Sequence, residues 1–183
     1  MRNTFHFWDG ELSRDYCQQL IEKCNRDLTL FPGEITKAEE QKPDSSFRNN
    51  LIGFTEDMEI REIISNYLYK ANRLSFGFLA DFIPAIQFSK YEEGTYYNFH
   101  HDVNWFNMDS MYDRKLSIVI QLSDENSYEG GDFQFCNEAH TPVTMRKQGS
   151  ILVFPSYINH RVTPIVKGTR YSLVCWMEGP RWQ

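Results

Sequence analysis

The sequence predicts an α+β fold in which two amphipathic helices precede a series of short strands. Apolar residues recur twice at helical spacing in the first half of the chain, the pattern changes to short β-rich segments from Ala85 onward, and helices and strands do not alternate. Short antiparallel strands in such number form a double-sheet jelly roll or a barrel. A chain of 183 residues fits one domain. We therefore expect a single domain over residues 1–183, with helical support over about 13–78 and a jelly-roll core over about 85–178.

The first elements are a short strand and a helix. Phe5 and Phe7 indicate a strand that ends at the turn pair Asp9-Gly10. Ser13 is the expected N-cap of a helix that runs from about Arg14 to Arg26. Its apolar stripe is formed by Tyr16, Cys17, Leu20, Ile21 and Cys24. This stripe is expected to pack on a sheet.

A second helix follows a long polar connection, which we expect over residues 32–50. One broad apolar face marks the helix and comprises Ile60, Ile63, Ile64, Tyr67, Leu68, Ala71 and Leu74. Gly77 and Pro84 mark its exit.

The strands after this helix are short runs between turn signals. We place them near residues 85–91, 96–102, 114–122, 131–136, 142–145, 150–154, 160–164 and 169–177.

The bulk composition is that of an ordinary globular protein, with 41% hydrophobic and 24% charged residues. A net charge of −6 argues against a nucleic-acid partner. No apolar run is long enough to span a bilayer, and the N-terminus lacks the apolar centre of a signal peptide. We therefore expect a cytoplasmic protein without a membrane partner, whose four cysteines are reduced and mostly buried.

The stretch from Tyr91 to Asp102 ends in two histidines and a carboxylate. In an extended strand, His100 and Asp102 point to one face and His101 points to the other. His160, further along the chain, offers a third ligand. Two histidines and one carboxylate with open coordination positions are the ligand set of non-heme Fe(II) oxygenases.

Such an iron site leaves room for a chelating 2-oxoacid and for dioxygen, and the far carboxylate of the oxoacid then needs a cation. Arg170 lies ten positions after His160, and its planar guanidinium suits a carboxylate. Ser172 lies two residues further on the same expected strand, so its hydroxyl is expected to face the same carboxylate.

Five short motifs in a fixed order carry a resemblance to a known family. They are Tyr91-x-x-Gly94-x-x-Tyr97-x-x-His100-x-Asp102, Arg114-Lys-Leu-Ser117, Glu129-Gly-Gly-Asp-Phe133, Gly149-x-x-x-x-Phe154-Pro-Ser-x-x-x-His160-Arg-Val and Gly168-x-Arg170-x-Ser172. Over Ile86 to Met177, about half of the chain, the sequence resembles the 2-oxoglutarate/Fe(II)-dependent dioxygenase superfamily, in its prolyl 4-hydroxylase-like branch.

The resemblance implies a double-stranded β-helix, which is a jelly roll, with N-terminal helices packed on the larger sheet. It implies Fe(II) bound by His100, Asp102 and His160, with no catalytic side chain beyond these ligands. It also implies that 2-oxoglutarate is the cosubstrate, with Arg170 on its C5 carboxylate and Tyr91 nearby. Ascorbate is a further candidate cofactor.

The expected reaction is hydroxylation of a C–H bond by dioxygen, with release of succinate and CO2. Halogenating relatives usually lack the carboxylate that Asp102 supplies, and Trp176 stands where nucleic-acid dealkylating relatives commonly carry a second arginine. The segment Val103–Asp113 is the length and composition of a mobile lid, and in prolyl hydroxylases the corresponding loop closes over a peptide.

The leading hypothesis for the substrate is therefore a prolyl residue in a protein or peptide. A free amino acid or another small metabolite is the alternative substrate. A non-catalytic jelly-roll module with a structural metal is a third hypothesis, although structural sites usually have four protein ligands.

Overall fold

The computed structural model describes residues 4–33, 46–103, 110–136 and 145–182. In chain order the elements are β1 (His6–Trp8), α1 (Arg14–Asp27), β2 (Phe31–Pro32), β3 (Leu51–Thr55), α2 (Met58–Ala71), the π-helical turn η1 (Asn72–Phe76), β4 (Ile86–Tyr91), β5 (Tyr97–His100), β6 (Tyr112–Gln121), β7 (Tyr128–Gly130), β8 (Phe133–Phe135), β9 (Ile151–Pro155), β10 (His160–Val162), β11 (Ile165–Gly168) and β12 (Arg170–Pro180). Neither α-helix of this described part is long and apolar enough to cross a membrane.

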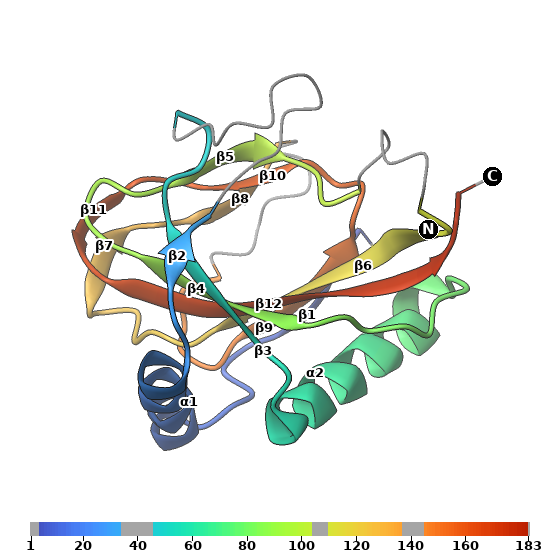
Figure 1. Ribbon diagram of the computed structural model, residues 1–183, viewed down its shortest axis with the longest axis horizontal. Coiled ribbons are helices and arrows are strands. Elements are labelled where there is room, and N and C mark those ends of the chain that lie inside the picture. Colours follow the sequence, from blue (N-terminus) through green and yellow to red (C-terminus); the bar gives the residue numbers. More distant parts are fainter. Residues whose placement is uncertain (1–3, 34–45, 104–109, 137–144, 183) are drawn as a thin grey trace.

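The described strands form one large sheet and two small ones. The large sheet has seven strands in the order β1-β9-β6-β12-β4-β3-β2, and the small sheets have the orders β5-β10-β8 and β11-β7. The strand pairs are antiparallel. Figure 1 shows β5, β10 and β8 in a layer above the large sheet, and α1 and α2 below it. The fold is therefore mostly β-structure with two helices on one side.

Each helix begins at a side chain that accepts a hydrogen bond from the first turn. Ser13 Oγ accepts from the backbone N–H of Tyr16 at 3.2 Å, as the sequence predicts. Asp57 Oδ1 accepts from the backbone N–H of Ile60 at 3.1 Å. Such caps satisfy donors that have no partner within the helix.

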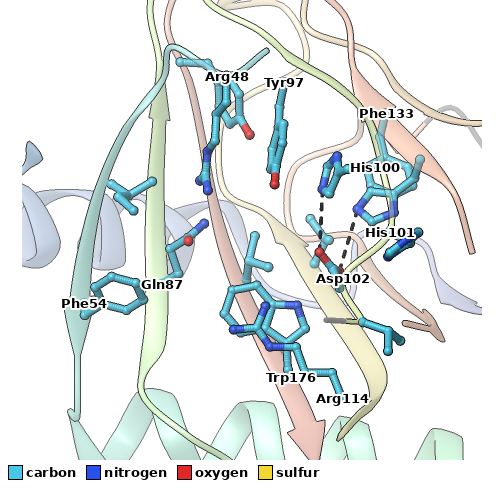
Figure 2. A pocket seen from close by; sticks show the side chains of 16 residues that line it. Arg48, Phe54, Gln87, Tyr97, His100, His101, Asp102, Arg114, Phe133 and Trp176 are labelled. Atoms are coloured by element: carbon cyan, nitrogen blue, oxygen red, sulfur yellow. Dashed lines mark ion pairs between the residues drawn. The ribbon is translucent and has the colours of Figure 1, made fainter. Parts of the chain in front are cut away.

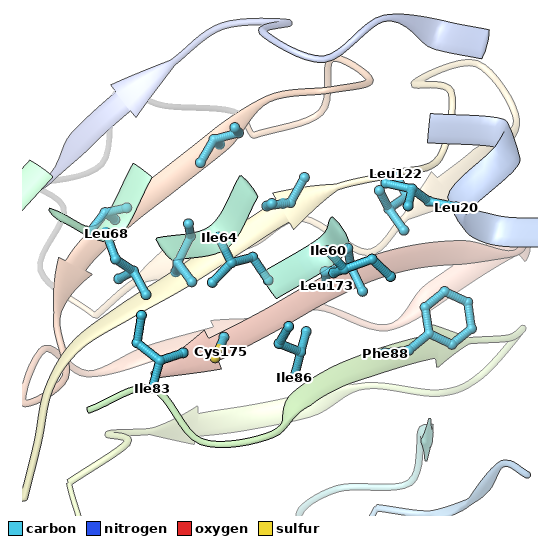
Figure 3. Close-up of a cluster of buried hydrophobic side chains, with 14 of the residues drawn as sticks. Leu20, Ile60, Ile64, Leu68, Ile83, Ile86, Phe88, Leu122, Leu173 and Cys175 are labelled. Atoms are coloured by element: carbon cyan, nitrogen blue, oxygen red, sulfur yellow. The ribbon is translucent and has the colours of Figure 1, made fainter. Parts of the chain in front are cut away.

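The main hydrophobic core lies between the helices and the large sheet. Figure 3 shows Leu20 of α1 and Ile60, Ile64 and Leu68 of α2 facing strand residues that include Ile86, Phe88, Leu173 and Cys175. All of these side chains are at most 3% exposed. Burying an aliphatic side chain of this kind contributes about 1.5–3 kcal/mol. The core therefore fixes one face of β12, and the residues of opposite parity on that strand point away from the helices.

The predicted helices are confirmed, but Leu74 does not belong to the apolar face of the second helix, which ends at Ala71. Leu74 is 57% exposed. It lies in η1, where the wider π-helical spacing moves it out of the register of the α2 face.

Several strand predictions need correction. The connection expected over 32–50 begins with a strand residue, since Pro32 belongs to β2. The strands β2, β3, β7 and β11 are not predicted from the sequence. The strand expected at 96–102 ends at His100. Most of the strand expected at 142–145, and residues 104–109 of the expected lid, lie outside the described residues.

The cysteines are mostly buried, as the sequence predicts. All four are free, and Cys17, Cys24 and Cys175 are buried while Cys136 is exposed.

Candidate active site

Strand pairing brings the two predicted histidine ligands together. His100 ends β5 and His160 begins β10, and the two residues are direct partners in the antiparallel register. Asp102 lies beside them, with 3.6 Å between His100 Nε2 and Asp102 Oδ1 and 3.8 Å between His160 Nε2 and Asp102 Oδ2 (Figure 2). The candidate ligand atoms of the three residues all lie within 4.8 Å of one another. A single divalent ion fits such a cluster.

Asp102 joins the cluster for a different reason from the strand alternation that the sequence predicts. Because β5 ends at His100, alternation along a strand does not place Asp102. Its position comes instead from its backbone N–H, which donates to the carbonyl of Ser156 at 2.8 Å. His101 is exposed and is not part of the cluster, as the sequence predicts.

Hydrogen bonds orient all three side chains. His100 Nδ1 lies 2.8 Å from the carbonyl of Asn98, and His160 Nδ1 lies 2.9 Å from the carbonyl of Ile158. A carbonyl only accepts, so each Nδ1 donates its proton, and in the neutral tautomer with this hydrogen bond the lone pair is on Nε2. Ser117 Oγ donates to Asp102 Oδ2 at 2.6 Å. These partners set the tautomers and the carboxylate orientation that a metal requires.

The electrostatics of the cluster favour a cation. Burial, followed by the proximity of His160, lowers the pKa of His100 to about 3, so its imidazole is neutral near pH 7. Burial alone would raise the pKa of Asp102, but His160, His100 and the Ser117 hydrogen bond outweigh it and leave the pKa lowered. One ionised carboxylate and a neutral imidazole with its lone pair are the protonation states in which these groups bind metals.

A tyrosine supports the first histidine. The Tyr97 ring stacks on the His100 ring with 3.5 Å between centroids and 9° between planes. Figure 2 shows Tyr97 between His100 and Arg48, whose Cζ lies 4.4 Å from the Tyr97 ring centroid.

Arg170 and Ser172 are on the predicted face of β12. Leu173, Cys175 and Met177 belong to the core between the helices and the large sheet, so Arg170 and Ser172 point to the other side of the sheet. Each of these two is 1% exposed. Arg170 Nε and Nη2 have no hydrogen-bond partner within the described part of the chain. An unpartnered buried guanidinium is a fitting partner for a ligand carboxylate.

Tyr91 lies opposite Arg170 in the pairing of β4 with β12. Its ring centroid is 5.6 Å from Arg170 Cζ, and the side chain is 4% exposed. Tyr91 lines the cavity around the three candidate ligands, whereas Arg170 and Ser172 are not among its lining residues.

The three residues of the metal cluster line a cavity of about 440 Å³. Sequence reasoning missed several of its other residues, among them Arg48, Phe54, Gln87 and Arg114. Arg114 Cζ lies 3.6 Å from the centroid of a Trp176 ring, which also lines the cavity. The motif that contains Arg114 was a usable signal, but Arg48 and Phe54 come from a region in which no strand was predicted.

Comparisons with known proteins place this geometry in a family. Residues 86–178, more than half of the chain, match the family described as the 2OG-Fe(II) oxygenase superfamily. A PKHD-type hydroxylase of Synechococcus sp. (strain CC9311) is 27% identical over 169 residues, which cover 91% of this chain and 74% of the relative. The chain spans about half the length, between 42% and 52%, of other curated PKHD-type hydroxylases that it matches.

Two solved structures share the fold. The viral collagen prolyl hydroxylase of Paramecium Bursaria Chlorella virus-1 has a TM-score of 0.73 and 18% identity and covers 97% of each chain. A Trichoplax adhaerens prolyl hydroxylase, in complex with a hypoxia inducible factor peptide fragment, has a TM-score of 0.75 and 16% identity and covers 96% of this chain and 83% of that one.

The fold and the two-histidine, one-carboxylate cluster define the class of a metal-dependent oxygenase. The chain belongs to the 2OG-Fe(II) oxygenase superfamily, and it is an enzyme of the 2-oxoglutarate-dependent dioxygenase type that uses Fe(II) and 2-oxoglutarate.

Proposed function

We propose that this enzyme hydroxylates a C–H bond of a prolyl residue in a protein or peptide, with release of succinate and CO2. The observation that carries the proposal is a cluster of three candidate ligands in a cavity that Tyr91 also lines, together with the buried guanidinium of Arg170 beside Tyr91, which is unpartnered at Nε and Nη2 among the described residues. The proposal includes a double-stranded β-helix built from the sheets, with the helices on the larger sheet, and a single domain over residues 1–183.

His100, Asp102 and His160 would hold the Fe(II). Three protein ligands leave coordination positions for the cosubstrate and for dioxygen, unlike a closed structural site. The bound iron supplies the activation of dioxygen that is coupled to decarboxylation of 2-oxoglutarate. The remaining tasks belong to the protein, which must orient the cosubstrate and hold a C–H bond nearby.

Arg170, Ser172 and Tyr91 would bind 2-oxoglutarate. The Arg170 guanidinium pairs with the C5 carboxylate, and Ser172, which shares its face of β12, donates a further hydrogen bond. Burial raises the pKa of Tyr91, so its phenol stays protonated and can donate as well. These groups fix one end of the cosubstrate away from the metal.

The substrate would occupy the rest of the cavity, toward Phe54, Gln87 and Trp176. A peptide substrate is supported by the two prolyl hydroxylases that share the fold, because one is a collagen prolyl hydroxylase and the Trichoplax enzyme is in complex with a peptide fragment. A free amino acid is the second candidate, because a cavity of about 440 Å³ can enclose a whole small molecule.

The test is oxygen transfer to defined substrates. The purified chain is incubated with Fe(II), 2-oxoglutarate and ascorbate, together with proline-containing peptides or free L-proline, and the products are analysed by mass spectrometry. We expect a peptide to gain one oxygen atom at proline, with one succinate formed per hydroxylation. Asp102→Ala is the matched inactive control. Modification of free proline, with every peptide unchanged, would favour the small-molecule candidate instead.

A further inference from the structure

A buried arginine other than Arg170 lines the cavity. Arg48 lies just before β3, is 7% exposed and lines the cavity on the far side of Tyr97 from His100 (Figure 2). Its Nε donates to Asn50 Oδ1 at 2.7 Å, whereas its Nη2 is buried without a hydrogen-bond partner among the described residues. One edge of the guanidinium is therefore held by the protein, and on the other edge Nη2 is a donor that no described residue satisfies.

The surroundings hold Arg48 in this position. A Cβ atom added to Gly33 would lie 2.5 Å from Arg48 Nε and 2.9 Å from Asn50 Oδ1, so only a glycine leaves room for this pair. The Arg48 guanidinium packs over the Tyr97 ring, with Cζ 4.4 Å from the ring centroid. The chain thus holds the guanidinium in one position, which reduces the entropic cost of ordering this side chain when a ligand binds.

No carboxylate in the described part of the chain forms an ion pair with Arg48. The other arginine of the cavity, Arg114, lies 3.7 Å from Glu178. Asp102 is the acidic group that lines the cavity, and it is engaged by two histidines and Ser117. Burying a cation without a countercharge is costly, and an anionic ligand would recover that cost.

The cosubstrate does not account for this cation. Arg170 already faces the C5 carboxylate under the proposed function, and the second carboxylate of 2-oxoglutarate belongs at the metal. The Tyr97 ring lies between Arg48 and His100, which separates Arg48 from the metal ligands. Arg48 instead shares the β3 and β4 side of the cavity with Ile52 and Gln87.

We propose that Arg48 binds a carboxylate of the substrate, so that the preferred substrate carries an acidic group close to the C–H bond that is oxidised. This inference rests on the proposed function and adds a chemical class to it. The carboxylate can come from an aspartate or glutamate next to the proline in a peptide, or from the α-carboxylate of a terminal or free amino acid.

Binding without turnover tests the proposal. The chain is loaded with Zn(II) and saturated with 2-oxoglutarate, and dissociation constants are measured by calorimetry for capped peptides that differ only in Glu or Gln beside proline. A peptide that ends in proline with a free carboxylate, and free L-proline, distinguish the two sources of the carboxylate. We expect wild type to bind at least one carboxylate ligand about tenfold or more tightly than its neutral partner, as for a hydrogen bond to a charged group.

Variants assign the preference to Arg48. Arg48→Gln is expected to abolish it, Arg48→Lys to retain part of it, and the exposed control Arg73→Gln to leave it unchanged. Equal affinity of wild type for acidic and neutral ligands overturns the proposal, and so does a preference that survives in Arg48→Gln. Loss of 2-oxoglutarate affinity in Arg48→Gln, with the peptide preference intact, would assign Arg48 to the cosubstrate and also overturn it.

The outcome is separable from folding and from the proposed function. If Arg48→Gln does not fold, the wild-type Glu and Gln peptides compared at low and high salt still decide, because a charge-dependent preference weakens with salt. If neutral and acidic peptides bind with equal affinity and both are hydroxylated, the proposed function stands and this inference fails. A carboxylate preference without any hydroxylation would do the reverse.

Discussion

His100 and His160 are direct partners across the antiparallel pair β5 and β10, and their imidazole centroids are 4.2 Å apart. Backbone pairing therefore sets the separation of two candidate ligands that are far apart in the sequence. The third ligand, Asp102, is attached to the same region through its hydrogen bond to Ser156. The cluster is preorganised by the sheet, so replacement of one side chain should remove the site without unfolding the strands.

Replacing His160 with Ala should remove the metal. The loss of one of three ligands is expected to reduce metal affinity by more than the roughly 10–100-fold that is typical of losing an outer hydrogen-bond partner. Metal content after dialysis, together with 2-oxoglutarate turnover, measures this effect. His6→Ala is the control, since His6 contacts Ser75 outside the cluster. A His160→Ala protein that keeps one metal per chain and full turnover would refute the assigned ligand set.

Replacing Ser117 with Ala should weaken the metal site without abolishing it. The Ser117 hydroxyl donates to Asp102 Oδ2 and lies 2.9 Å from Ser156 Oγ, so it fixes the orientation of the carboxylate. We expect metal affinity to fall by about 10–100-fold. Competition titration against a chelator of known affinity measures it. Ser89→Ala, a buried serine of the same sheet whose Oγ accepts from Gln87, should leave metal affinity unchanged.

The sequence was sufficient where the information is local. Ser13, the helix stripes and the alternation of Arg170, Ser172 and Leu173 follow from capping and periodicity, and the structure agrees with them except at Leu74. The three candidate ligands were found because their residue types and order form a dense pattern between Tyr91 and Arg170. No contact between distant segments had to be known for these predictions.

The remaining features depend on contacts between distant segments. The pairing of β3 with β4 brings Phe54 to the cavity, and Arg48 reaches the cavity from just before β3. A short apolar run beside a polar connection gives no periodic signal, so β3 is not predicted from the sequence. Asp102 was assigned correctly to the cluster through an incorrect strand argument, because the hydrogen bond to Ser156 is not visible in the sequence. Tertiary pairing thus determines which residues surround the metal cluster.

The N-cap of α2 should make stability depend on pH. A hydrogen bond from Lys23, followed by the backbone N–H of Ile60, lowers the pKa of Asp57 below its unfolded value. The charge of Asp57 therefore stabilises the fold above the unfolded pKa of about 3.9, and this contribution is lost as the pH falls through the lower, folded pKa. Asp57→Asn keeps a capping side chain without the charge. We expect urea unfolding to separate wild type from Asp57→Asn near pH 7, and the difference to shrink in acid as the pH falls through the folded pKa.

Asp57→Ala is the matched variant that also removes the cap. It should lose about 1 kcal/mol of unfolding free energy, and much of that loss should persist in acid because a protonated carboxyl can still accept the Ile60 hydrogen bond. If the unfolding free energy of wild type exceeds that of Asp57→Asn by the same amount near pH 7 and in acid, the carboxylate charge does not contribute.

Replacing Arg170 with Met should separate stability from cosubstrate binding. The guanidinium is buried with Nε and Nη2 unpartnered in the described chain, so an apolar side chain of similar length removes a desolvation cost. Without 2-oxoglutarate we expect the variant to be as stable as wild type or more stable by about 1 kcal/mol. With Zn(II) and 2-oxoglutarate at about 100 times its Kd, wild type should gain about 2.7 kcal/mol of unfolding free energy, and the variant should gain almost nothing.

Thermal unfolding with and without 2-oxoglutarate measures both effects. Arg161→Met is the control, since Arg161 is a partly exposed arginine bonded to Gln134. If Arg170→Met is stabilised by 2-oxoglutarate as strongly as wild type, the cosubstrate carboxylate does not bind at this guanidinium.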